Sequence, residues 1–229
     1  MGPPVTEVAL VRIVEGADPD TAMVGAAETL HAQPGCQLVR WATEHENPHA
    51  LYAFVDWDKT ASHELFMTTD AYNTFRQQLA PLLAESPIVY HVAFKPFPPI
   101  VLNNNLWKGK REATTTVVEL LHAYFPASYS TERQEKTATD VERYMKHTKI
   151  QARGATGESA VGWAEEELDY KGEKARLLLI AFGWESIDAH IKYQGTDAFS
   201  ATVSILKGLE ELKGFTVGHV SNYVVEKDA

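Results

Sequence analysis

The chain has 229 residues, 45% of them hydrophobic, and a formal net charge of −10. That length allows one large domain or two small ones. The negative charge and the absence of a basic run make nucleic acid and anionic membrane surfaces poor partners. A single cysteine, Cys36, allows no intrachain disulfide, and no apolar run approaches the roughly 20 residues that span a bilayer. We therefore expect a cytoplasmic protein.

The first hundred residues predict the order strand, helix, strand, strand, helix, strand. Residues 6–15 (TEVALVRIVE) are rich in β-branched side chains, which favour a strand. A helix is expected to begin at Asp18-Pro19, where Asp can cap it, and to end before Pro34-Gly35. Further strands are expected at 36–44, 49–57 and 87–96, and helical segments at 60–67 and from Asp70 onward. This is the order of the ferredoxin-like unit.

The same order recurs after a connecting segment. Residues 101–112 lack periodicity and follow a proline-rich stretch, so they are predicted to link a first repeat (1–100) to a second (113–229). Thr131 and Gln134 form a capping-box pattern at the start of the second repeat's long helix. Its strands are expected at 114–125, 159–168, 174–184 and 214–225.

An internal repeat supports this division. The stretch WDKTASHELFMTTDAY, which begins at Trp57, matches WESIDAHIKYQGTDAF, which begins at Trp184. The match places a Trp, a His and a Thr-Asp-Ala-aromatic run in one register without a gap. For the first strands, the interpretation aligns 8–13 with 118–123, which pairs Ala9 with Glu119.

The strands predict how the two repeats pack. Residues 177–182 (LLLIAF) form a continuous apolar run, so both faces of their sheet should be buried. Two sheets that face each other with helices outside satisfy this requirement. The predicted fold is α+β: two tandem ferredoxin-like (βαββαβ) repeats that form an α/β barrel, either as a monomer or as a homodimer. A small apolar or aromatic ligand is expected inside the barrel.

Residues 6–98 and 115–225 resemble the antibiotic biosynthesis monooxygenase-like domains of the dimeric α/β-barrel superfamily. The resemblance rests on VDW and FGW at the ends of strands, a following helix with a central His, the Thr-Asp-Ala-aromatic run and a final His-Val strand. It implies the barrel fold. It also implies one of several activities, which include cofactor-free monooxygenases, polyketide cyclases, haem-binding enzymes and lyases. Cyclases of this superfamily carry a catalytic tyrosine at the helix position that Tyr193 occupies.

His190 and Tyr193 are the first candidate catalytic residues. They are three residues apart, so they share one helical stripe, and a His beside a Tyr could take a proton from a phenol or enol. The competing interpretation gives His190 a structural role, because His63 repeats it. Phe66 stands where the second half has Tyr193, which makes Tyr193 specific to one half.

Three further candidates lie on strands of the second half. His219, like His91 in the first half, could face the barrel or cap the end of a sheet. Glu119 and His122 have opposite parity, so only one of them can point inward. Because these titratable residues gather in the second half, we expect one working pocket, built by that half and closed by the first.

The sequence favours a cofactor-independent enzyme of monooxygenase or cyclase type. It would act by proton abstraction on a small aromatic or polyketide-like substrate in secondary metabolism. No metal-ligand spacing, phosphate loop or dinucleotide fingerprint occurs, so neither a metal nor another cofactor is expected. One alternative is a haem protein with His190 as the axial ligand. Another is a non-catalytic barrel that binds a small ligand or serves a stress response.

Overall fold

The computed structural model describes residues 2–106 and 115–226, and its elements follow the predicted order twice. The first half contains β1 (Val5–Arg12), α1 (Pro19–His31), β2 (Cys36–Thr43), β3 (Ala50–Trp57), α2 (Thr60–Met67), α3 (Asp70–Leu79), η1 (Ala80–Leu82) and β4 (Ile88–Val92). The short elements η2 (Ile100–Leu102) and β5 (Asn105–Leu106) follow. The second half contains β6 (Val117–Pro126), α4 (Thr131–Gln151), β7 (Ala155–Tyr170), β8 (Glu173–Trp184), α5 (Ile187–Gln194), α6 (Asp197–Lys207), β9 (Gly214–Val220) and β10 (Tyr223–Val225).

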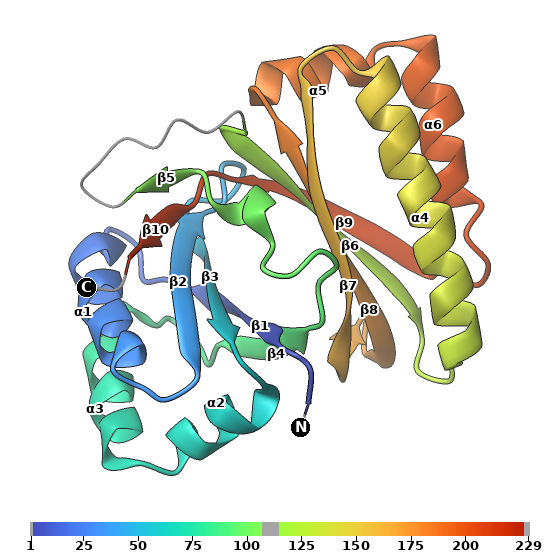
Figure 1. Cartoon of the computed structure of the whole chain (residues 1–229). Coiled ribbons are helices and arrows are strands. Elements are labelled where there is room, and N and C mark those ends of the chain that lie inside the picture. Colours follow the sequence, from blue (N-terminus) through green and yellow to red (C-terminus); the bar gives the residue numbers. More distant parts are fainter. Residues whose placement is uncertain (1, 107–114, 227–229) are drawn as a thin grey trace.

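The strands form one curled sheet with helices on its outer side (Figure 1). The first half contributes the order β2-β3-β1-β4 and the second half β7-β8-β6-β9. The halves join where Val92 of β4 pairs with Ala164 of β7. The sheet meets itself again where Glu44, just beyond β2, bridges to Val220 of β9. This arrangement confirms the predicted tandem α/β barrel.

Side chains alternate between the barrel interior and the helix layer along each strand. In β1, Val8 packs in the interior cluster, whereas Val5 and Val11 pack against helices. In β6, Leu120 faces the interior and Leu121 faces the helices. Both faces of the sheet are therefore apolar, as the continuous apolar runs predicted.

The barrel interior is a packed core. Phe54, Leu177 and Leu179 fill it together with Val101 and Leu102 of the connecting segment, which are 2% and 0% exposed. This corrects two expectations. The beginning of the linker is an integral part of the core, and the barrel interior is filled by side chains where a ligand was expected. Residues 107–114, the later part of the linker region, lie outside the described residues.

A buried ion pair ties the connecting segment to the barrel. Arg40 donates a hydrogen bond from Nη2 to Oδ2 of Asp56 at 2.8 Å, and Thr6 donates its hydroxyl to the other carboxylate oxygen at 2.8 Å. Arg40 also donates from Nε to the side-chain oxygen of Asn103. The connecting segment is thus held by a charged group that has no access to water.

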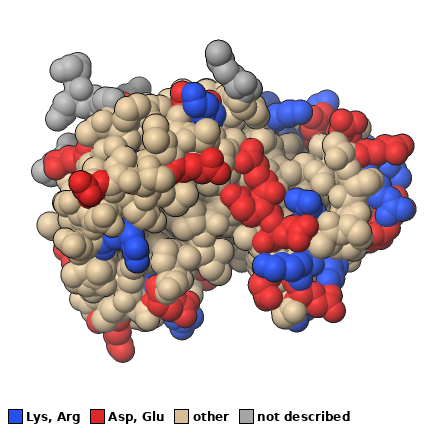
Figure 2. Space-filling model, turned by 90° about the horizontal axis from the view of Figure 1, so that it is seen from below, with Lys and Arg blue, Asp and Glu red and all other residues tan. Residues whose placement is uncertain are grey.

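The surface differs between the two halves. Charged side chains crowd over the second half in Figure 2, whereas the visible face of the first half is largely uncharged. No helix in the part of the chain that the structure describes is long and apolar enough to cross a membrane.

Candidate active site

A hollow of about 1010 Å³ lies between the sheet and the helices of the first half. Strands β1, β3 and β4 form one wall, and α1, α2 and α3 form the other. The hollow exists because helix α3 does not pack closely on the sheet. Its apolar face consists of Tyr72, Phe75 and Leu79, yet none of its residues is buried. In the second half, the corresponding helix α6 buries Thr202 and Leu206. The apolar face of α3 therefore lines the hollow, where an amphipathic helix ordinarily packs on the core.

Small side chains on the sheet make room for the hollow. Ala9 of β1 lies opposite Ala53 of β3, and both line the hollow. The same positions in the second half hold a large pair, Leu121 of β6 opposite Ile180 of β8. Two residues farther along the third strand of each half, the first half has Val55 and the second half has the larger Phe182.

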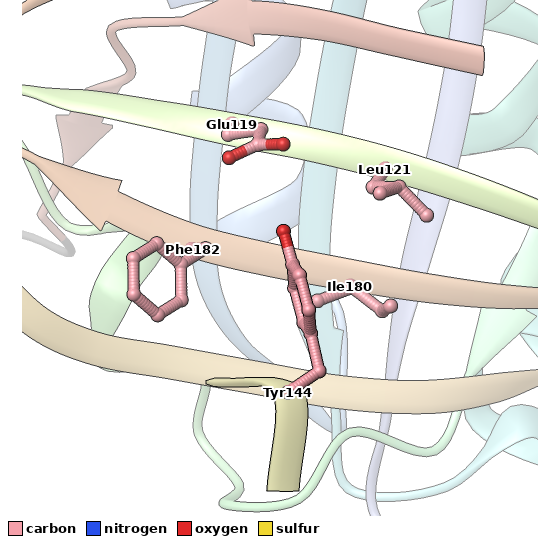
Figure 3. Close-up of a pocket in the computed structure, with 5 residues that line it drawn as sticks. All are labelled: Glu119, Leu121, Tyr144, Ile180 and Phe182. Carbon is pink, nitrogen blue, oxygen red and sulfur yellow. The ribbon is translucent and has the colours of Figure 1, made fainter. Parts of the chain in front are cut away.

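The helix layer shows the same difference. The buried residues Met23, Ala26, Ala27 and Leu30 of α1 have the same spacing as Val141, Tyr144, Met145 and Thr148 of α4. Tyr144 therefore takes the place of Ala26, which lines the hollow. Figure 3 shows Tyr144 reaching from its helix toward Glu119, past Ile180 and Phe182. The space that remains there has no room for a water molecule.

The polar side chains that line the open hollow include Glu7 and His63, together with Tyr72, Asn73, Arg76, Gln77, Glu85 and Ser86. Trp57 donates a hydrogen bond from its indole N–H to Oε2 of Glu7 at 2.8 Å, which fixes the carboxylate. Nε2 of His63 lies 3.6 Å from the same oxygen, and the ring of Trp57 stacks on the imidazole. A carboxylate and an imidazole are thus held side by side in a largely apolar space.

The imidazole of His63 continues into a chain of contacts that reaches the surface. Its Nδ1 lies 2.8 Å from Nε2 of His91, and Nδ1 of His91 lies 2.6 Å from Oε1 of Glu166. Glu166 belongs to β7 of the second half, and its side chain is 38% exposed. Two histidines therefore connect the hollow with a carboxylate from the other half.

The surroundings shift the pKa values of the two imidazoles in opposite directions. Burial lowers the pKa of His63, although the nearby charge of Glu7 acts against this shift. Burial would also lower the pKa of His91, but its hydrogen bond to Glu166 and the charges of Glu166 and Glu7 raise that pKa overall. His63 is therefore neutral near pH 7 and available as a base.

The second half contains the same network beneath its closed space. Trp184 donates to Glu119 at 2.9 Å, and His190 lies 2.7 Å from His219. His219 contacts Glu46, which lies between β2 and β3 of the first half. Burial and the neighbouring His219 lower the pKa of His190 to about 4. Each half thus receives its outer carboxylate from the other half.

The strand register corrects the pairing of Ala9 with Glu119. Glu7 lies opposite Val55, as Glu119 lies opposite Phe182, so Glu7 is the counterpart of Glu119. The interpretation from sequence was shifted by two residues. A carboxylate at this position is therefore present in both halves, which removes one reason to place the working pocket in the second half.

His122, not Glu119, is the residue that points into the barrel. Its Nε2 lies 3.2 Å from the hydroxyl of Tyr90, and burial lowers its pKa to about 4. Glu119 faces the helix layer, where burial raises its pKa despite the hydrogen bond from Trp184. His122 and Glu119 therefore lie on opposite faces of the sheet and do not form one site.

Tyr193 belongs to α5, and its side chain contacts α6. Its hydroxyl donates to Oγ1 of Thr202 at 2.9 Å. In the first half, the corresponding residues Phe66 and Phe75 make an edge-to-face ring contact at 5.7 Å. The hydroxyls of Tyr193 and Thr202 therefore join α5 to α6, as the rings of Phe66 and Phe75 join α2 to α3. Tyr193 lies in the second half, where the space between sheet and helices is closed.

We expect Tyr193→Phe to leave activity unchanged and to lower the free energy of unfolding by about 1 kcal/mol, the typical contribution of one hydrogen bond. Thr202 keeps a partner, because it donates to the carbonyl of Ala198. Turnover rates and urea unfolding curves of both proteins check this. A loss of activity without a loss of stability would return Tyr193 to the catalytic site.

Sequence reasoning missed Glu7, Glu46 and Glu166. A signal for Glu7 was present: Val5-Thr6-Glu7 and Val117-Val118-Glu119 share a Val-x-Glu pattern at the start of each repeat. Glu46 and Glu166 carry no such signal, because each acts on the half to which it does not belong.

The residues around His190 do not fit an axial haem ligand. Nδ1 of His190 contacts His219, and its Nε2 lies 3.1 Å from Nε2 of Gln194. The adjoining space is closed by Tyr144 and Phe182. Within residues 2–106 and 115–226, no group of three or more His, Cys, Asp or Glu is arranged to hold a metal ion.

No protein-family model matches the chain, and no curated protein matches it. Solved structures do match over nearly the whole length. An anthrone oxidase-like protein is 13% identical with a TM-score of 0.63, covering 96% of this chain and 93% of its own. A candidate monooxygenase from Lactobacillus acidophilus is 12% identical with a TM-score of 0.57, covering 97% and 96%. A candidate chlorite dismutase is 11% identical with a TM-score of 0.52, covering 96% and 95%. At such low identity, these similarities show the fold alone.

Proposed function

We propose that the hollow of the first half binds a small aromatic molecule and removes an acidic proton from it. The observation that carries this proposal is the pairing of Glu7 and His63 in a hollow whose sheet wall is otherwise lined by apolar side chains such as Ala9, Ala53 and Val55. At about 1010 Å³, the hollow is at the upper end of the range of small-molecule sites, which is roughly 300–1,000 Å³. The rings of Phe66, Tyr72 and Phe75 offer stacking surfaces to a flat ligand.

His63 is the base in this proposal. When its Nδ1–H is donated to His91, the lone pair on Nε2 is free to accept a proton from a phenol or an enolisable C–H. The carboxylate of Glu7, 3.6 Å away, then stabilises the imidazolium that forms. Both side chains are buried, which strengthens this attraction relative to that between two exposed charges.

The resulting carbanion or phenolate gives two reaction types. It can close a ring, as in a cyclase, or react with dioxygen, as in a monooxygenase. In the second case, a methylene between aryl rings and O₂ yield a carbonyl and water. The fold shared with an anthrone oxidase-like protein supports the second type. We propose that this chemistry belongs to secondary metabolism and takes place in the cytoplasm. One tandem chain would form the complete barrel.

Ala26→Tyr tests the location of the site. This change gives the first half the side chain that closes the second, so we expect it to weaken binding of 1,8-dihydroxyanthraquinone by about 100-fold or more. Stability should not fall, because the new ring enters an existing hollow. Calorimetric titration and thermal unfolding of both proteins measure these effects.

Activity is read as oxygen consumption with 1,8-dihydroxyanthrone. Wild type should consume oxygen, and Ala26→Tyr should not. Binding without consumption or a cyclised product would favour the non-catalytic, ligand-binding alternative. Unchanged binding by Ala26→Tyr would show that the hollow is not the site.

A further inference from the structure

We propose that Glu166 of the second half is the proton exit for the site in the first half. This inference rests on the proposed function, because the proton in question is the one that His63 removes. Glu166 does not line the hollow and both of its side-chain hydrogen bonds go to His91, so it is a positioning and relay residue.

The contacts form a path that leads outward. From His63 the path runs to His91 at 2.8 Å and from His91 to Glu166 at 2.6 Å. The side chains are 6%, 7% and 38% exposed in that order, so Glu166 is the most exposed of the three. The second carboxylate oxygen of Glu166 accepts the backbone N–H of His91 at 2.8 Å, which holds the carboxylate in line.

One assignment of the ring protons carries a proton along this path. In the resting state, His91 donates Nδ1–H to Glu166, and its Nε2 accepts Nδ1–H from His63. A proton that arrives at Nε2 of His63 lets the Nδ1 proton shift to His91. The Nδ1 proton of His91 then moves to Glu166 and on to water. One proton enters the chain and one leaves, and no electrons are transferred. Both rings then carry their proton on Nε2, so each must return to its first tautomer, by rotating or by exchanging protons with water, before the next proton is accepted.

The charges that face His91 support its protonated intermediate. Glu7 on β1 and Glu165 and Glu166 on β7 are negative, and His63 on α2 is the remaining titratable neighbour. Together the three carboxylates outweigh the effect of burial on the pKa of His91.

This assignment gives the second half a role in the reaction although its own space is closed. Each half provides a carboxylate to the other, since Glu46 of the first half contacts His219 in the same way as Glu166 contacts His91. Glu46 therefore provides a matched control: it has the same chemistry and geometry, but its network ends beneath a space that Tyr144 fills.

The test compares Glu166→Gln with Glu46→Gln in the full chain, with oxygen consumption from 1,8-dihydroxyanthrone measured against pH. We expect Glu166→Gln to lower kcat by about 10-fold or more with little change in KM, and Glu46→Gln to change neither. The acidic limb of the profile should move to lower pH, because the group that raises the pKa of His91 is gone. Added imidazole buffer should restore the rate by accepting the proton directly.

An independent readout follows the ring nitrogens of His91 by NMR, which should titrate at lower pH in Glu166→Gln whether or not substrate turns over. Equal losses in both variants, or a loss without a shift in the profile and without rescue by buffer, would overturn the exit. A wild type that neither consumes oxygen nor forms a cyclised product would overturn the proposed function and the exit together. Unchanged turnover by Glu166→Gln would overturn the exit alone.

Discussion

Glu7→Gln should lower kcat/KM for 1,8-dihydroxyanthrone by about 10²-fold or more, the usual contribution of acid–base machinery. The amide cannot stabilise the imidazolium of His63, whose Nε2 lies 3.6 Å from the carboxylate. It can still accept the indole N–H of Trp57, which the carboxylate accepts at 2.8 Å in the wild type. The site should therefore keep its shape while losing its charge, and unfolding temperatures should change little.

Glu119→Gln is the matched control for this prediction. Glu119 accepts from Trp184 at 2.9 Å and lies 3.6 Å from His190, so its contacts repeat those of Glu7. The space beside Glu119 is filled by Tyr144 and Phe182, whereas Glu7 lines the open hollow. We expect Glu119→Gln to retain full turnover. If it loses as much activity as Glu7→Gln, the two networks are either both catalytic or both structural.

Asp56→Ala is expected to lower the free energy of unfolding by about 3–5 kcal/mol, the cost of leaving one partner of a buried ion pair uncompensated. Arg40 is fully buried and would lose the carboxylate that it contacts at 2.8 Å. One of its guanidinium nitrogens, Nη1, already has no hydrogen-bond partner among the described residues. No other carboxylate in the described part of the chain forms an ion pair with Arg40 within 4.0 Å.

Urea unfolding at pH 7 measures this loss, and two further variants separate its causes. Thr6→Val removes only the hydroxyl that donates to Asp56 and should cost about 1 kcal/mol. Replacing both charges, as Arg40→Met with Asp56→Leu, should recover most of the stability. If Asp56→Ala costs no more than Thr6→Val, the ion pair does not hold the barrel as described.

The fold could be predicted from sequence because its signals are periodic and occur twice. The stretch that begins at Trp57 and recurs at Trp184 placed the third strand and the following helices of each half correctly. The first strands were harder. A shift of two residues keeps every side chain on its own face, so alternation alone could not show that Glu7, and not Ala9, corresponds to Glu119.

The open hollow could not be predicted in the same way. It arises from small residues such as Ala9, Ala26 and Ala53 that lie on three different elements. Each of them is unremarkable within its own strand or helix, and their effect appears only when the elements pack together. The contribution of Glu166 was hidden for a similar reason, because no local pattern relates a strand of one half to a histidine of the other.

The presence of both halves in one chain has a consequence for how such a protein can change. In a barrel assembled from two identical copies, a single substitution alters both sites at once. In the tandem chain, the position of Ala26 and that of Tyr144 are encoded separately, so one space can be filled while the other stays open. Joining the repeats therefore frees the two sites from symmetry. It allows one half to specialise in holding a ligand and the other in supporting it.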